Sequence, residues 1–156
     1  MEHPFDPPAR PDVTGSTRFL AYVSAMDSDG VVSRYAQAWA SNDIEAVMAA
    51  YAPDFVAHYG GSSPFAGTHH GKDEFLRVLI TTTARSRRQL DTIEAVFDDG
   101  DRGAIFVREG ISVNGEVHVV ARALRYRVAD GLLAECWLYD QDQHLVDAAW
   151  SQPDPT

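Results

Sequence analysis

The sequence predicts an α+β fold in which helices come first and one curved antiparallel sheet then closes over them, enclosing a single pocket. Three turn signals mark the sheet, namely Asp98-Asp99-Gly100-Asp101, Asn114-Gly115 and Asp130-Gly131. Asn-Gly and Asp-Gly favour tight turns of positive φ that match the twist of the flanking strands. The β-branched runs around these turns predict strands at about 89–98, 103–113, 116–128 and 132–140. Function is therefore sought among the polar residues of the enclosed pocket.

Helical patterns precede the sheet. Residues 1–14 form a proline-rich arm that we expect to be extended and mobile, and the weakly periodic segment Thr17–Met26 suggests a short helix. The first clear helix follows Asp27-Ser28-Asp29, and its apolar residues recur at helical spacing. They are Val31, Val32, Tyr35, Ala38 and Trp39. A second helix begins at Asn42-Asp43-Ile44-Glu45, which resembles a capping box. The apolar face of this second helix consists of Ile44, Val47, Met48 and Tyr51.

A short strand, a loop and two further helices complete the predicted elements. Pro53 ends the second helix, Phe55–Tyr59 predicts a short strand, and the loop that follows carries His69-His70. A third helix opens at Gly71-Lys72-Asp73, and Gln143–Trp150 predicts a short terminal helix after the sheet.

Composition indicates one acidic globular domain, which we place at 15–151 with a tail at 152–156. The chain has 156 residues and a formal net charge of −10, which argues against nucleic acid and anionic membranes as partners. One cysteine and no apolar run long enough to span a membrane fit a cytoplasmic location. The basic cluster Arg85-Ser86-Arg87-Arg88 complements a helix C-terminus or, alternatively, forms an anion site.

Several segments together resemble the NTF2-like superfamily, in particular its SnoaL-like and ketosteroid-isomerase-like proteins. They are Val32-Ser33-Arg34-Tyr35, Asn42-Asp43-Ile44-Glu45-Ala46-Val47, Tyr51-Ala52-Pro53-Asp54-Phe55, Pro64-Phe65-Ala66-Gly67, Gly71-Lys72-Asp73-Glu74-Phe75 and Asp130-Gly131-Leu132-Leu133-Ala134-Glu135-Cys136-Trp137. The resemblance spans roughly residues 30–150 and implies a cone in which the sheet wraps over the helices. The superfamily includes isomerases, dehydratases, cyclases, epoxide hydrolases and proteins without chemistry, so the fold alone assigns no reaction.

The resemblance assigns roles to individual residues. Tyr35 falls on the tyrosine that donates a hydrogen bond to the developing enolate in the isomerases, and Tyr51 falls on a tyrosine that supports it. The isomerases' proton-shuttling aspartate corresponds to Tyr59, and their second acid falls near Ala123. A steroid-type proton shift by the standard arrangement is therefore not expected.

The last strand offers a replacement acid. By the resemblance, alternate residues of this strand line the pocket, and here they are Cys136, Leu138 and Asp140. Asp142 lies just beyond, near the acidic residue that cyclases and epoxide hydrolases of the superfamily keep, and the alignment leaves open which aspartate matches. A carboxylate in an apolar pocket has a raised pKa, which suits proton transfer. The alternative is that either aspartate caps the helix that begins at Gln143.

Histidines provide further acid/base candidates. By the resemblance, His58 and His118 are acid/base candidates, because the dehydratases of this fold use histidines together with tyrosines. If Tyr59 faces inward, however, the alternation of the strand turns His58 outward. No His-x-His or His-Glu-x-x-His spacing is present, so we expect neither a metal nor another cofactor.

We therefore expect a small-molecule enzyme, of isomerase, cyclase or lyase type, that uses general acid/base chemistry on a hydrophobic carbonyl compound such as a polyketide or terpenoid. The catalytic candidates are Asp140, Tyr35, Asp142, His118 and His58. The substrate-binding candidates are Tyr51, Tyr59, Cys136, Leu138 and Trp39. The alternative is a noncatalytic module that binds an apolar ligand or a protein partner. By the resemblance, the outer face of the sheet pairs with a second copy to form a homodimer.

Overall fold

The computed structural model describes residues 29–156, and the predicted arm at 1–14 and the helix suggested at Thr17–Met26 lie outside this range. The elements are α2 (Val31–Ala40), α3 (Ile44–Ala49), β1 (Tyr51–Tyr59), β2 (Gly67–His70), α4 (Lys72–Ser86), β3 (Gln89–Asp98), β4 (Arg102–Val113), β5 (Glu116–Ala129), β6 (Leu132–Asp140) and α5 (Gln143–Trp150). The order confirms the predicted α+β class.

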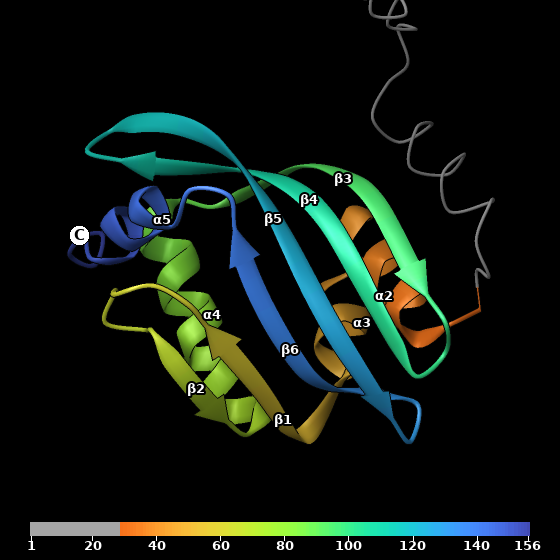
Figure 1. The fold of residues 1–156 in the computed structure, drawn as a ribbon. Coiled ribbons are helices and arrows are strands. Elements are labelled where there is room, and N and C mark those ends of the chain that lie inside the picture. Colours follow the sequence, from red (N-terminus) through yellow and green to blue (C-terminus); the bar gives the residue numbers. More distant parts are fainter. Residues whose placement is uncertain (1–28) are drawn as a thin grey trace, which may run out of the picture.

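The strands form one six-stranded sheet in the order β2-β1-β6-β5-β4-β3. All neighbouring strands are antiparallel except β1 and β6, which run parallel. The sheet curves around α2, α3 and α4, which lie on its concave side (Figure 1). A sheet covered on one face buries every second residue of each strand, so the inward residues of β4, β5 and β6 face the helices.

The predicted turns form as their sequences require. Asn114 and Asp130 have φ values of 51° and 52°, and the glycines that follow them, Gly115 and Gly131, have φ values of 85° and 74°. Two successive positive φ angles are the signature of the tight hairpin turn that Asn-Gly and Asp-Gly favour. These local signals explain why the meander β3 to β6 was predictable.

The first part of the sheet differs from the prediction. α3 ends at Ala49, and Tyr51 is the first residue of β1 instead of the last residue of a helix. The backbone N–H of Leu133 donates to the carbonyl of Ala50, which draws this segment alongside β6. The histidine pair His69-His70, expected in a loop, lies in the short edge strand β2.

The two faces of the sheet have different chemistry. On β5, the side chains of Val120, Arg122, Leu124 and Tyr126 are buried, and the residues between them face outward. Several large apolar side chains are exposed on the outer face, namely Phe97, Phe106, Val117, Val119 and Tyr139. In the described part of the chain, no helix combines the length and the hydropathy that a membrane crossing requires.

Candidate functional site

A cavity of about 690 Å³ lies between the sheet and the helices α2, α3 and α4. Its walls are largely apolar and include Phe55, Phe75, Leu79, Leu124 and Leu138. Ile44 and Ile80 also line it, yet they are 56% and 60% exposed, so they mark an apolar rim open to solvent. The volume lies within the range usual for small-molecule sites, and the polar groups in the cavity are few.

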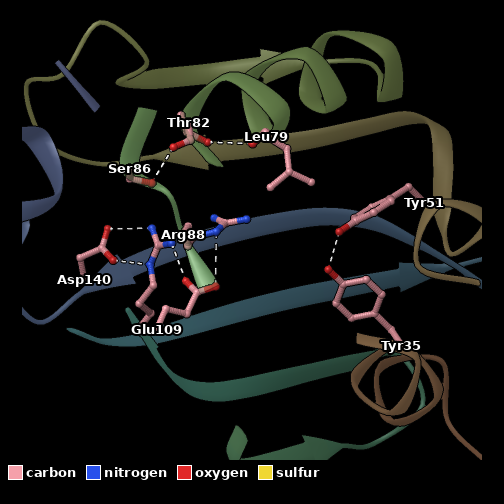
Figure 2. A network of polar contacts seen from close by, with 9 residues as sticks. Tyr35, Tyr51, Leu79, Thr82, Ser86, Arg88, Glu109 and Asp140 are labelled. Atoms are coloured by element: carbon pink, nitrogen blue, oxygen red, sulfur yellow. Dashed lines mark hydrogen bonds and ion pairs between the residues drawn. The ribbon is translucent and has the colours of Figure 1, made fainter. Parts of the chain in front are cut away.

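Three tyrosine side chains meet in this cavity. The hydroxyl oxygens of Tyr35 on α2 and Tyr51 on β1 are 2.5 Å apart, and both residues are buried (Figure 2). Tyr126 on β5 packs edge-on against Tyr35 and hydrogen-bonds to it. These contacts place a small cluster of hydroxyl groups in an apolar wall.

Burial raises the pKa of all three phenols, but not equally. For Tyr35, hydrogen bonds from Tyr51 and Tyr126 offset part of the rise that burial causes. For Tyr51 and Tyr126 the pKa lies well above its ordinary value, because burial and the neighbouring Tyr35 act in the same direction. Tyr35 is therefore the phenol of the cluster at which hydrogen bonds from its neighbours act against the effect of burial on the pKa.

Two further polar groups line the cavity. Burial raises the pKa of the Tyr59 phenol, and its hydroxyl has no hydrogen-bond partner within residues 29–156. Burial raises the pKa of the Cys136 thiol to about 12. Both groups are protonated at neutral pH, so Tyr59 is an available donor and Cys136 is not a nucleophile.

A row of charged side chains crosses the inner face of β4, β5 and β6. Arg122 donates from Nε to Asp140 Oδ1 at 2.5 Å, from Nη2 to Asp140 Oδ2 at 3.3 Å and from Nη1 to Glu109 Oε2 at 2.8 Å. The side chains of these three residues are 2–3% exposed. All three nitrogens of Arg122 are thus engaged with carboxylates, and the two carboxylates strengthen its protonation, raising its pKa.

Arg88, which follows α4, approaches the other side of Glu109. Its Nε lies 3.4 Å from Glu109 Oε1, and both residues line the cavity (Figure 2). Burial alone would raise the pKa of Glu109, but Arg88 and Arg122 outweigh that effect and hold the pKa below its ordinary value. Glu109 is therefore an ionised carboxylate at neutral pH, set in the cavity wall.

The two candidate aspartates occupy other positions. Asp140 is held by Arg122 through both carboxylate oxygens and is not among the residues that line the cavity. Asp142 is the N-cap of α5, and its Oδ1 accepts from the backbone N–H of Leu145 at 3.0 Å. The capping alternative therefore describes the contacts of Asp142, whereas Cys136 and Leu138 do line the cavity, as the alternation predicted.

The two candidate histidines also lie away from the cavity lining. The His58 ring stacks on Trp137 and contacts Thr68 Oγ1 and Glu135 Oε1 at 3.0 Å and 2.7 Å. His118 is half-buried on β5 and is absent from the lining residues. Within residues 29–156, no cluster of three or more His, Cys, Asp or Glu side chains is arranged to hold a metal ion.

Among the polar lining residues, Glu109, Arg122 and Tyr126 were not site candidates in the sequence analysis, and Arg88 entered it only as part of the basic cluster. One signal for Arg122 was available. It alternates in phase with Val120, Leu124 and Tyr126, so it is a charged residue on the apolar face of its strand. The expected lining residues Tyr35, Trp39, Tyr51, Tyr59, Cys136 and Leu138 all line the cavity.

The fold has many solved counterparts. A protein of unknown function with a cystatin-like fold from Xanthomonas campestris is 25% identical, with a TM-score of 0.70 over 78% of this chain and 96% of that one. An NTF2-like protein from Burkholderia thailandensis is 24% identical, with a TM-score of 0.65 over 79% of this chain and 95% of that one. A protein from Mesorhizobium loti named as a candidate SnoaL-like polyketide cyclase is 18% identical, with a TM-score of 0.61 over 70% and 95%.

A comparison with curated proteins gives no significant match. The family comparison does: residues 32–136 match the model of the SnoaL-like domain. This segment runs from α2 into β6 and contains nearly all of the cavity wall. The chain belongs to the SnoaL-like domain family, within the NTF2-like superfamily.

Proposed function

We propose that this protein is a cofactor-independent enzyme that acts by general acid/base catalysis on an apolar carbonyl compound of polyketide or terpenoid type. The observation that carries the proposal is that an ionised carboxylate, Glu109, and a cluster of phenols around Tyr35 line the same apolar cavity. A carboxylate accepts a proton, and a phenol donates a hydrogen bond to a carbonyl oxygen. Enolisation needs both groups.

In the proposed step, Glu109 removes a proton from the carbon next to the substrate carbonyl. The electron pair of that C–H bond moves into the carbonyl, and the resulting enolate oxygen accepts a hydrogen bond from Tyr35. Return of the proton from Glu109 to another carbon gives isomerisation. Attack of the enolate carbon on a second carbonyl, whose oxygen takes the proton from Glu109, gives cyclisation. Expulsion of a β-hydroxyl, which takes the proton from Glu109 and leaves as water, gives dehydration. The phenol cluster supports this role because Tyr35 is hydrogen-bonded to both Tyr51 and Tyr126, and hydroxyl groups in such a chain polarise one another.

In this proposal the general base is Glu109 and not Asp140, the residue that the sequence indicated. Arginines bind both oxygens of each carboxylate, Arg122 at Asp140 and Arg122 with Arg88 at Glu109, but only Glu109 lines the cavity. We therefore assign Asp140 a positioning role: it fixes the Arg122 guanidinium, which orients Glu109 toward the cavity. His58, His118 and Asp142 have no part in this proposal, since none of them lines the cavity.

The test uses 2-tetralone, a neutral bicyclic ketone with acidic α-protons, as the probe. Its α-protons exchange with deuterium in D₂O, and NMR follows the loss of their signal. We expect the protein to accelerate this exchange, and we expect Glu109→Gln and Tyr35→Phe each to reduce the acceleration by about a hundredfold. Asp142→Asn, which keeps the cap of α5, is the matched control and should exchange the probe like the wild type.

The competing function is a module that binds an apolar ligand without turnover. It predicts that 2-tetralone binds, as seen by quenching of tryptophan fluorescence, while its α-protons exchange no faster than in buffer. That result, or unchanged exchange in Glu109→Gln, would overturn the enzymatic proposal.

We further propose that two copies of the chain pair through the outer face of the sheet to form a homodimer. The exposed apolar side chains of this face include the touching pair Phe97 and Phe106, whose ring centroids are 5.8 Å apart. Light scattering should give a mass of about twice 17.2 kDa for the wild type. Phe106→Glu should return the mass to that of one chain, and a monomeric wild type would contradict the pairing.

A further inference from the structure

Arg88 carries hydrogen-bond donors that the protein leaves unused. Within residues 29–156, its guanidinium contacts only Glu109, through Nε at 3.4 Å. The side chain is 14% exposed and lines the cavity, and the end of the guanidinium turns away from Glu109 (Figure 2). A guanidinium has five N–H donors, and in this half-buried side chain those without protein partners are available to an acceptor from a ligand or from water.

The position of Arg88 distinguishes it from the rest of its basic cluster. Arg85 donates from Nε to Asp154 and from Nη1 to the Trp150 carbonyl, and its guanidinium lies over the Phe65 ring. Arg87 is exposed and has the left-handed backbone that ends α4. Only Arg88 of the three lines the cavity. One residue of a cluster that otherwise stabilises the end of a helix is thus available to a ligand.

The charges around Arg88 indicate which kind of acceptor fits. Two guanidiniums, Arg88 and Arg122, face two carboxylates, Glu109 and Asp140, so the cluster is charge-balanced. A ligand carboxylate beside Arg88 would add an uncompensated negative charge close to Glu109, in a site of low dielectric. A neutral oxygen atom would accept hydrogen bonds from the free N–H groups of Arg88 without adding a negative charge beside Glu109.

We infer that the ligand of this cavity carries a second neutral carbonyl oxygen, which Arg88 binds while Tyr35 and its partners bind the first. The tyrosine cluster and Arg88 lie apart in the same cavity, so the two oxygens belong to different parts of one apolar body (Figure 2). The inference rests on the proposed function and narrows its substrate class to dicarbonyl compounds. Arg88 is then a determinant of specificity that monocarbonyl substrates do not use.

The experiment compares 2-tetralones that differ in one ring substituent: ethyl, acetyl or carboxylate, each at position 6 and at position 7. Dissociation constants come from quenching of tryptophan fluorescence, since Trp39 lines the cavity. For the wild type, we expect one acetyl isomer to bind roughly tenfold more tightly than the matching ethyl compound, because a hydrogen bond to a charged donor is worth about that factor or more. The carboxylates should bind more weakly than the acetyl compounds.

The variants separate a ligand contact from a structural role. Arg88→Gln should bring the acetyl and ethyl affinities to within about twofold of each other, whereas Arg87→Gln, which removes the same charge at an exposed neighbour, should keep the tenfold gap. Arg88→Lys keeps the charge beside Glu109 but loses the guanidinium fork, and it should narrow the gap if Arg88→Gln does not fold. A purely structural Arg88 predicts that all six probes weaken together.

Each remaining outcome counts against a specific claim. Equal wild-type affinity for acetyl and ethyl compounds, or a gap that persists in Arg88→Gln, overturns the inference. Tightest binding by a carboxylate overturns it in favour of an anion site. If the wild type accelerates exchange of 2-tetralone but shows one of these binding results, only the role of Arg88 is overturned. If the wild type neither binds the probes nor accelerates exchange, the proposed enzymatic function is overturned as well.

Discussion

The neighbouring hydroxyl groups distinguish Tyr35 from the other buried tyrosines. A buried phenol is ordinarily a poor acid, and burial raises the pKa of Tyr35, Tyr51, Tyr59 and Tyr126 alike. Only at Tyr35 do two hydrogen bonds act against burial. The family resemblance placed Tyr51 beside Tyr35, but the sequence did not indicate Tyr126, because it comes from a strand distant in the sequence.

The raised pKa values predict a specific response to alkali. The native protein keeps these four phenols protonated above pH 10, whereas the unfolded chain releases their protons near that value, so stability falls as the pH rises through 10. In a titration followed by tyrosinate absorbance at 295 nm, the four buried residues should ionise together with the loss of near-ultraviolet circular dichroism. Ionisation of all tyrosines near pH 10 with the tertiary signal intact would contradict this expectation.

The strands β4, β5 and β6 are joined by the charged row as well as by backbone hydrogen bonds. Arg122 lies directly opposite Asp140 in the register of β5 and β6, and Glu109 reaches it from β4. The sequence predicted these strands and their turns, because the turn signals are local. It did not predict the row, because Arg122, Glu109 and Asp140 come together only through the pairing of three strands.

Removal of Arg122 should be costly for this part of the sheet. Arg122→Leu leaves Glu109 and Asp140 as buried carboxylates without their main partner, and we expect a loss of about 3–5 kcal/mol in the free energy of unfolding at pH 7. The loss should shrink as the pH falls, because Arg122 holds the pKa of Glu109 down in the wild type and protonation of Glu109 removes that buried charge. Urea denaturation at pH 7 and pH 4 measures both values, and an equal loss at the two pH values would argue against buried charge as its cause.

The cap of α5 can be tested separately from any chemistry. Asp142→Ala removes the acceptor of the Leu145 N–H, and we expect it to lower the free energy of unfolding by about 1 kcal/mol while leaving exchange of 2-tetralone unchanged. Asp142→Asn retains a side-chain acceptor and should lose much less. A drop in exchange with both variants, at unchanged stability, would return Asp142 to the catalytic candidates.

In the whole molecule, the position of the cavity was easier to predict than its chemistry. Helices followed by a meander imply a sheet closed over helices, and strand alternation correctly turned Cys136 and Leu138 inward. The same alternation could not show that Asp140 is engaged by Arg122 instead of facing the space. Arginines bind both Glu109 and Asp140, and only the contacts between elements decide that Glu109, not Asp140, lines the cavity.

The parallel pairing of β1 with β6 has a consequence for how the chain reaches this state. Ala57 lies beside Cys136, so β1 and its edge partner β2 join the other strands of the sheet only after β6 has been synthesised. The hairpins from β3 to β6 form from near neighbours, whereas closure of this seam has to wait for a large loop to fold back on itself. During translation, the edge of β1 that pairs with β6 therefore has no strand partner until β6 has left the ribosome.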